Sequence, residues 1–178
     1  TILLAPALVF TFLKAKNLSV GNSRIDESLL ATAQTIMEKA TEKQVPLIFP
    51  TDYLVTKNSF AVPLPYEIVH QINTGFTGIS FGPETTIHFQ EQIRQAKTLF
   101  VNGISGNEQF PETVANMKNL FNTIQQNSLA VRVIAGGDTV GLAEKFGFDE
   151  KLGFFSSGGG ATLTYLSGSG LPGLLALC

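Results

Sequence analysis

The sequence is poor in charged residues, in arginine and in cysteine, and each shortage excludes a class of protein. Charged side chains make up 15% of the 178 residues, with 12 basic against 14 acidic, for a formal net charge of −2. Proteins grip nucleic acid mainly through Lys and Arg contacts with phosphates. Because the arginines are few and scattered, we expect no nucleic-acid partner. The single cysteine, Cys178, excludes a disulfide framework and any metal site built from several cysteines.

Long hydrophobic runs are absent as well. The longest uncharged apolar stretch, 2–13, is interrupted by Pro6 and is much shorter than the roughly 20 residues of a membrane-spanning helix. No basic-then-apolar signal peptide precedes it. The length suits one domain with a sizeable core. We therefore expect a soluble, cytoplasmic, monomeric protein without a membrane partner, forming one domain over residues 1–178.

Predicted strands and helices alternate along the chain. Apolar residues at three-and-four spacing predict helices, and short apolar runs predict strands. Strands are expected at 1–4, 46–50, 76–81, 98–101, 129–135 and 154–155, and helices at 7–16, 26–42, 83–97, 111–124, 138–146 and 158–166. A hairpin is expected from strands at 52–55 and 59–62, with 63–75 irregular and 171–177 a hydrophobic tail. This alternation predicts an α/β fold, a three-layer α/β/α arrangement with a mostly parallel, doubly wound sheet.

Glycine is unevenly distributed, and three glycine clusters follow predicted strands. They are Asn102–Gly106, Ala135–Thr139 and Ser156–Ala161. In a parallel sheet the carboxyl ends of the strands meet at one edge, where ligands bind. Glycine lets the backbone approach a ligand closely, and a helix N-terminus attracts phosphate. The clusters therefore favour a phosphate or nucleotide site, and the third is the best candidate because three glycines open a helix beside Ser156 and Ser157.

Other readings stay open for individual residues. Each glycine cluster alone is equally compatible with an ordinary turn, and Asp138 has the position of a helix N-cap. Neither GxxxxGK[ST] nor GxGxxG follows a predicted strand. His70 and His88 lack metal-ligand spacing, and the absence of a GxSxG motif argues against a nucleophilic hydrolase.

At the glycine clusters the sequence resembles the C-terminal, nucleotide-binding half of phosphoglycerate kinase. Matching motifs follow the family's order along nearly the whole chain, and this shared order is more specific than any one motif. They are Phe10–Lys14 (FTFLK), Val20–Ser23 ((I/V)GxS), Pro50–Asp52 (PxD), Gly82–Thr85 (GPE(S/T)), Asn102–Gly103 (the NG of WNGP), Gly136–Thr139 (GGGD(S/T)), Ser157–Ala161 ((S/T)GGGA) and Leu171–Gly173 (LPG).

The resemblance implies that ADP or ATP binds along this edge with Mg²⁺. Glycines of the third cluster would face the transferring phosphoryl group, Asp138 would hold the Mg²⁺-nucleotide, and Gly78 and Ile79 would flank the adenine. The nucleotide-binding residues implied are Gly78, Ile79, Asn102, Gly103, Gln109, Gly136, Gly137, Asp138 and Thr139; the catalytic ones are Gly158, Gly159 and Gly160; the metal residue is Asp138.

The resemblance also implies a Rossmann-like transferase of glycolysis, a kinase moving a phosphoryl group between 1,3-bisphosphoglycerate and ADP. The family's GGAKVxDK segment, with its phosphate-contacting lysines, is not in this sequence. Nor is the N-terminal domain, through which alone 3-phosphoglycerate would be bound. We therefore expect the chain to be a fragment of a two-domain kinase that is inactive in isolation.

Three departures from the family pattern favour an alternative. The family's glycine triplet is Ala5–Ala7 here, Gln109 stands at the ribose-binding glutamate unless Glu108 substitutes, and Thr164 replaces the Glu of GGGASLE. The alternative is a degenerate, kinase-like scaffold without nucleotide chemistry. A general α/β binder of phosphate esters is the third reading.

Overall fold

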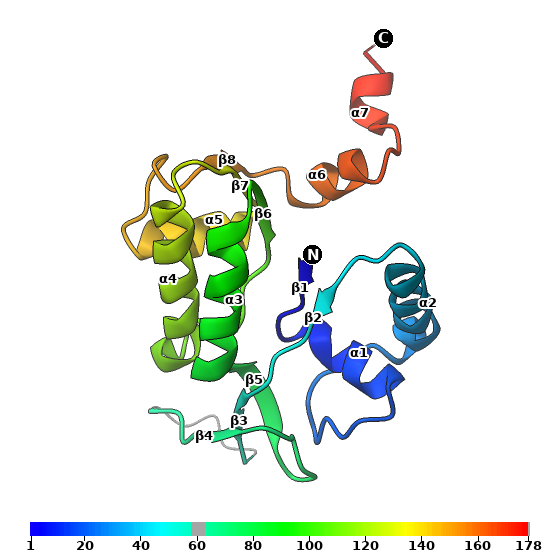
Figure 1. Ribbon diagram of the computed structural model, residues 1–178, viewed down its shortest axis with the longest axis vertical. Helices are drawn as coiled ribbons and strands as arrows, with labels where there is room; N and C mark the ends of the chain where they lie inside the picture. The colour runs from blue at the N-terminus through cyan, green and yellow to red at the C-terminus, as the bar shows by residue number, and fades with distance from the viewer. Residues whose placement is uncertain (58–62, 178) are drawn as a thin grey trace. The chain divides into compact units, whose positions relative to one another are not determined.

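A computed structural model describes residues 1–57 and 63–177 (Figure 1). The elements in chain order are β1 (Ile2–Leu3), α1 (Leu8–Ala15), the 3-10 helix η1 (Glu27–Leu29), α2 (Leu30–Glu42), β2 (Leu47–Ile48), β3 (Tyr53–Thr56), β4 (Glu67–Val69), β5 (Thr77–Phe81), α3 (Pro83–Gln95), β6 (Thr98–Asn102), α4 (Pro111–Gln126), β7 (Val131–Ala135), α5 (Gly137–Lys145), β8 (Phe154–Ser156), α6 (Gly159–Leu166) and α7 (Pro172–Leu175). The chain divides into two compact units, residues 1–91 with 105–119, and residues 92–104 with 120–178. Helices α3 and α4 contribute residues to both units.

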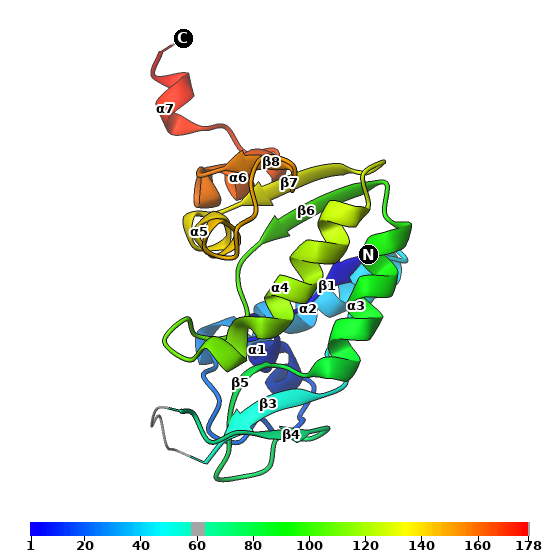
Figure 2. The same ribbon diagram turned by 90° about the vertical axis from the view of Figure 1, so that its left-hand side faces the viewer.

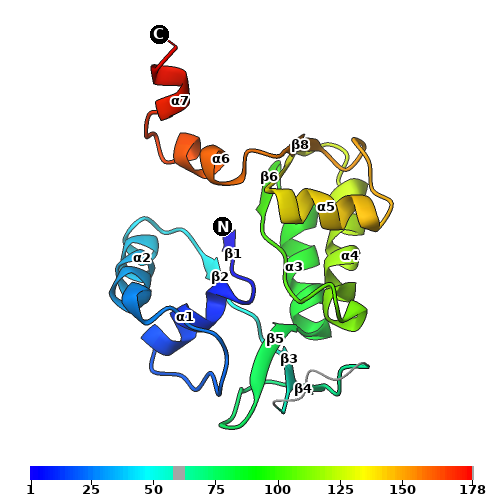
Figure 3. The same ribbon diagram turned by 180° about the vertical axis from the view of Figure 1, so that it is seen from behind.

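The first unit contains two small sheets and the helices α1 and α2. Strand β1 pairs in parallel with β2, and β3 is the central strand of the antiparallel sheet β4-β3-β5. Helices α1 and α2 lie side by side (Figures 1 and 3). The apolar face of α1 supplies Val9, Phe10 and Leu13 to the core, where Phe10 contacts Tyr53 with ring centroids 6.3 Å apart. Burying each large side chain stabilises the unit by roughly 1.5–3 kcal/mol.

The second unit is built on the parallel sheet β6-β7-β8. Figure 2 shows β6 and β7 running side by side in the same direction, with α5 following β7. The core centres on Phe121, Ile134 and Leu142, each at most 1% exposed. The ring of Phe121 packs edge-on against Phe148 at 5.6 Å between centroids, an arrangement that aromatic pairs prefer.

The expected α/β fold class is confirmed, because strands and helices alternate and two of the three described sheets are parallel. The antiparallel sheet differs from the expected pattern. The hairpin partner predicted at 59–62 lies outside the described residues, and β3 instead pairs with β4 and β5. Predicting 63–75 as wholly irregular was wrong for β4, since a strand of three residues carries too little periodicity to be recognised and is defined by its partner.

The C-terminal segment also departs from the expectation of a plain hydrophobic tail. Residues 172–175 form the short helix α7, which begins at Pro172, where a missing N–H costs nothing. No helix within the described residues combines the length and apolarity needed to cross a bilayer.

Candidate functional site

The carboxyl ends of β6, β7 and β8 lie at one edge of the parallel sheet. Asn102 on β6 is the register partner of Ala135 on β7, and Ala135 is the partner of Ser156 on β8. Each of the three glycine clusters begins at or directly after one of these residues. Two of them open helices, since α5 begins at Gly137 and α6 at Gly159. Parallel pairing therefore brings the starts of the three clusters together at one edge of the sheet in the second unit, to which residues 102–104 of the first cluster belong.

The turn after β6 is tied to the start of α5. The backbone N–H of Gly103 donates to Oγ1 of Thr139 over 2.8 Å, and Thr139 is only 1% exposed. Gly136 has a φ of +93°, and a Cβ at this position would lie 2.8 Å from Oδ1 of Asn102. Glycine is therefore required both for its backbone conformation and for the close approach of the Asn102 side chain.

The turn after β8 adjoins the same place. The N–H of Gly136 donates to the carbonyl oxygen of Ser156 over 2.9 Å. A Cβ at Gly159 would lie 3.7 Å from Cα of Gly136. The backbones that precede α5 and α6 are thus in contact, and the N-termini of the two helices converge.

Both helix starts leave backbone donors available. The N-caps are Gly136 and Gly158, which have no side chain that could accept from the first N–H groups of the helix. Among the described residues, neither helix therefore has a side-chain cap at its N-cap position. A Cβ at Gly137 or at Gly160 would meet no described heavy atom within 4 Å, so the backbone there is open. Free N–H groups at the positive end of a helix dipole attract anions, phosphate above all.

Asp138 brings a negative charge to this edge. It lies exposed in the first turn of α5. Mg²⁺ is usually held by one or two carboxylates together with substrate phosphates. The described residues contain no group of three or more His, Cys, Asp or Glu side chains that could hold a metal ion. The donors fit a Mg²⁺ ion that is shared with a bound phosphate.

The other sequence-predicted site residues, Gly78, Ile79 and Gln109, belong to the first unit. Gly78 is buried, its N–H donates to Oγ of Ser23 over 2.8 Å, and a Cβ there would lie 2.6 Å from Cζ of Phe10. Ile79 packs against a small apolar cluster of Leu54, Leu64 and Phe110. Gln109 is exposed, and its N–H donates to Oδ1 of Asn107 over 3.0 Å.

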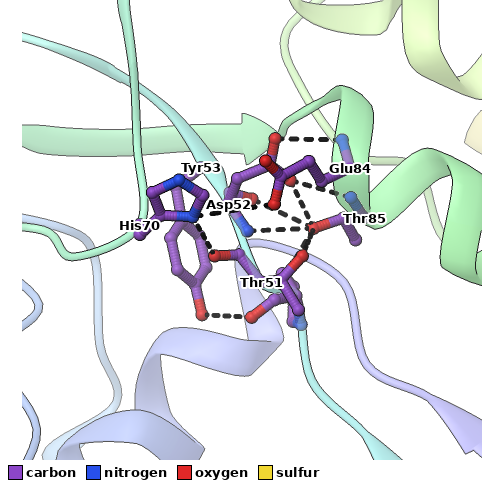
Figure 4. A network of polar contacts seen from close by, with 7 residues as sticks. Thr51, Asp52, Tyr53, His70, Glu84 and Thr85 are labelled. Atoms are coloured by element: carbon purple, nitrogen blue, oxygen red, sulfur yellow. Dashed lines mark hydrogen bonds and ion pairs between the residues drawn. The ribbon is translucent and has the colours of Figure 1, made fainter.

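Sequence reasoning missed a buried polar network around Asp52 (Figure 4). Asp52 is 1% exposed, and its carboxylate accepts from the N–H groups of Glu84 (3.1 Å) and Thr85 (2.8 Å) at the start of α3. The hydroxyl of Thr85 donates to the same carboxylate over 2.6 Å and accepts from the N–H of Thr51 over 2.9 Å. Asp52 therefore caps α3 from 33 positions away in the sequence.

A sequence signal for this cap exists. Helix α3 begins at Pro83 after Gly82, so no Ser, Thr, Asp or Asn stands directly before it. A Cβ at Gly82 would overlap the Asp52 carboxylate. A helix start with glycine where a capping side chain is expected points to a cap from elsewhere, and the PxD motif supplies it.

Burial of Tyr53 beside this network predicts a loss of stability at high pH. Burial, with a smaller contribution from the Asp52 carboxylate, raises the pKa of Tyr53 from 10.0 to about 12. The neutral phenol is thus favoured in the folded state, and its hydroxyl donates to the carbonyl of Pro50 over 3.0 Å. Its stabilising contribution is complete below pH 10 and is lost as the pH rises through about 12.

We expect the free energy of unfolding, measured in urea, to fall between pH 10 and 12 in the wild type. The fall should be smaller in Tyr53→Phe. The difference in tyrosinate absorbance between the two proteins isolates the titration of Tyr53. Ionisation of Tyr53 at its ordinary pKa in the folded protein would contradict the prediction.

Comparisons with known proteins give a consistent result. The family model described as phosphoglycerate kinase matches residues 1–169. The phosphoglycerate kinase of Trichodesmium erythraeum is 34% identical over 177 residues, which cover 99% of this chain and 44% of the relative. The cytosolic phosphoglycerate kinase 3 of Arabidopsis thaliana is 37% identical over 180 residues, covering 99% of this chain and 45% of the relative.

Solved structures support the same grouping. The structure of phosphoglycerate kinase from Coxiella burnetii superposes with a TM-score of 0.87 at 27% identity, covering 94% of this chain and 44% of that one. The enzyme from Pyrococcus horikoshii superposes with a TM-score of 0.75 at 22% identity, which supports the fold alone. The chain spans less than half the length of the curated relatives it matches.

Proposed function

The chain belongs to the phosphoglycerate kinase family, and from that premise we propose that it is the nucleotide-binding part of such a kinase, taking ADP or ATP with Mg²⁺. The observation that carries the proposal is the convergence of two helix N-termini without side-chain caps at the edge of the β6-β7-β8 sheet. The hydrogen bond from the Gly136 N–H to the Ser156 carbonyl joins the two turns, which supports the inference that donors at both helix starts reach one phosphate chain.

The residues of this edge would act by orienting the phosphates and stabilising their charge. In phosphoryl transfer the protein contributes positioning and electrostatics, and forms no covalent bond itself. Backbone N–H groups at the starts of α5 and α6 are fixed donors that need no reorganisation as negative charge moves. Asp138 would hold the Mg²⁺ that neutralises the phosphates, and the open backbone at Gly137 and Gly160 would admit them.

For the whole protein we propose the family's reversible reaction. An oxygen of the terminal phosphate of ADP attacks the phosphorus of the acyl phosphate of 1,3-bisphosphoglycerate. The acyl P–O bond breaks, ATP forms, and the carboxylate of 3-phosphoglycerate leaves. We also propose a cytoplasmic location and a monomeric state for the chain. We propose further that residues 1–178 form a single nucleotide-binding domain.

Calorimetry with Asp138→Asn tests the nucleotide site. We expect wild type to bind Mg²⁺-ADP and the variant to bind it about tenfold more weakly, since a charged contact with the metal is lost. Binding of metal-free ADP should be unchanged or tighter in the variant, because a carboxylate repels bare phosphates.

Asp149→Asn is the matched control, since Asp149 is another exposed aspartate of the second unit and pairs with Lys151. It should bind Mg²⁺-ADP as the wild type does. Absence of heat from wild type at millimolar Mg²⁺-ADP would overturn the nucleotide function.

The scaffold alternative is supported by two departures from the family pattern, one in each unit. Ala5–Ala7 precede α1 where the family has three glycines. The hydroxyl of Thr164, at the family's Glu position, donates to the Gly160 carbonyl of its own helix over 3.0 Å. A scaffold would fold and show no nucleotide binding in the calorimetric experiment.

A further inference from the structure

A pair of hydroxyl groups joins α6 to the end of β8. Oγ of Ser156, the last residue of β8, lies 3.0 Å from Oγ1 of Thr162, and either hydroxyl can donate. The N–H of Gly158 points to the same Ser156 oxygen at 3.4 Å. A Cβ at Gly158 would lie 2.9 Å from Oγ1 of Thr162. Gly158, the first glycine of the turn, therefore lies close to both hydroxyl groups.

Helix α6 is not held in place by an apolar core. Among residues 159–166, all of them described, none is buried, and Leu163, Tyr165 and Leu166 are at least half exposed. Glycine has more backbone freedom than any other residue, and Gly158, Gly159 and Gly160 form the entry to this helix. The direction of its first N–H groups thus depends on polar contacts near its start.

Ser156 connects this pair to the neighbouring helix start. Its carbonyl oxygen accepts from the N–H of Gly136, the N-cap of α5, over 2.9 Å. Its side chain reaches Thr162 in the second turn of α6. One residue therefore couples the two converging helix N-termini.

We propose that Thr162, through its hydrogen bond with Ser156, is a positioning residue that fixes the Gly158–Gly160 turn for phosphate binding. The inference rests on the proposed nucleotide function and deepens it. Thr162 acts on the backbone and does not itself touch the ligand. The group it serves is the phosphate chain of a nucleoside diphosphate, since the turn presents backbone N–H donors.

The test compares Thr162→Val, which keeps the shape of the side chain and removes the hydroxyl, with Thr162→Ser, which keeps the hydroxyl. We expect Thr162→Val to weaken Mg²⁺-ADP binding about fivefold, the effect of one neutral hydrogen bond. Thr162→Ser should restore most of the affinity. Ser156→Ala should weaken binding at least as much, because it also removes the oxygen that faces the Gly158 N–H, and the double variant should be no worse than Ser156→Ala alone.

Two further readouts separate positioning from a general structural role. Thr162→Val should leave the melting temperature within about 2 °C of wild type, because α6 contributes no buried side chain. It should speed amide hydrogen exchange at residues 159–161 in the absence of any ligand. Thr35→Val is the control, since the Thr35 hydroxyl bonds only to Ala31 of its own helix among the described contacts, and all three readouts should match wild type.

The outcomes distinguish the two proposals. If wild type binds Mg²⁺-ADP and Thr162→Val binds it equally well, the positioning role is wrong while the nucleotide function stands. If wild type binds no Mg²⁺-ADP, the nucleotide function fails and the positioning role with it. Unchanged exchange at residues 159–161 in Thr162→Val also overturns the positioning role, whatever the nucleotide result.

Discussion

Replacing Asp52 with alanine is expected to lower the free energy of unfolding by about 3 kcal/mol. The substitution leaves the N–H groups of Glu84 and Thr85 and the hydroxyl of Thr85 without their shared acceptor. Each unsatisfied buried donor costs roughly 1–3 kcal/mol. Urea unfolding followed by far-UV circular dichroism measures the change.

Asp26→Ala is the matched control. Asp26 caps η1 in the same way, with its carboxylate accepting from the N–H and hydroxyl of Ser28, but at an exposed position. Water replaces the lost bonds there, so we expect a loss of about 1 kcal/mol or less. Asp52→Asn should fall between the two, since its amide oxygen still accepts from Thr85. Equal losses for Asp52→Ala and Asp26→Ala would refute the role of the buried cap.

The second large effect is expected for Gly136→Ala, in both stability and ligand binding. The φ of +93° is strained for any residue with a Cβ, at a cost of roughly 1–3 kcal/mol. The new Cβ would lie 2.8 Å from Oδ1 of Asn102, so the Asn102 side chain or the turn must move. Because this turn precedes α5 and is hydrogen-bonded to Ser156 before α6, we expect Mg²⁺-ADP binding to fall at least about tenfold, measured by calorimetry.

Gly141→Ala provides the comparison within the same helix. Gly141 lies inside α5, and a Cβ there would meet no described heavy atom within 4 Å. Alanine is the better helix former by roughly 1 kcal/mol, so this variant should be slightly more stable and bind as wild type does. Equal stability and equal Mg²⁺-ADP affinity of Gly136→Ala and Gly141→Ala would contradict the requirement for glycine at position 136.

The meeting of the three glycine clusters at one sheet edge was predictable from the sequence, because it follows from the direction of parallel strands. Parallel strands carry their carboxyl ends to one edge, so the turns after β6, β7 and β8 had to meet once the strands were recognised. Helices α2 and α4 were predictable from apolar spacing, which repeats over more than ten residues in each.

Contacts between distant residues were not predictable in the same way. Asp52 and Thr85 are 33 positions apart, and no periodic pattern links a capping side chain to a helix that it does not precede. The Ser156–Thr162 bond is close in sequence, but two hydroxyl groups six residues apart are common and carry no signal alone. Strand β4 was missed because its partner defines it.

The exposure of α6 has a consequence for affinity. A helix of eight residues that buries no side chain gains little from packing, and isolated short helices are marginal in water. When a phosphate binds at its start, part of the binding free energy therefore offsets the conformational entropy that the helix loses on becoming fully ordered. The observed affinity is lower by that part. Any protein surface that covers Leu163 and Leu166, which are three residues apart and at least half exposed, would order α6 in advance and raise nucleotide affinity without touching the nucleotide. Nucleotide affinity is therefore open to control through the exposed apolar side chains of α6.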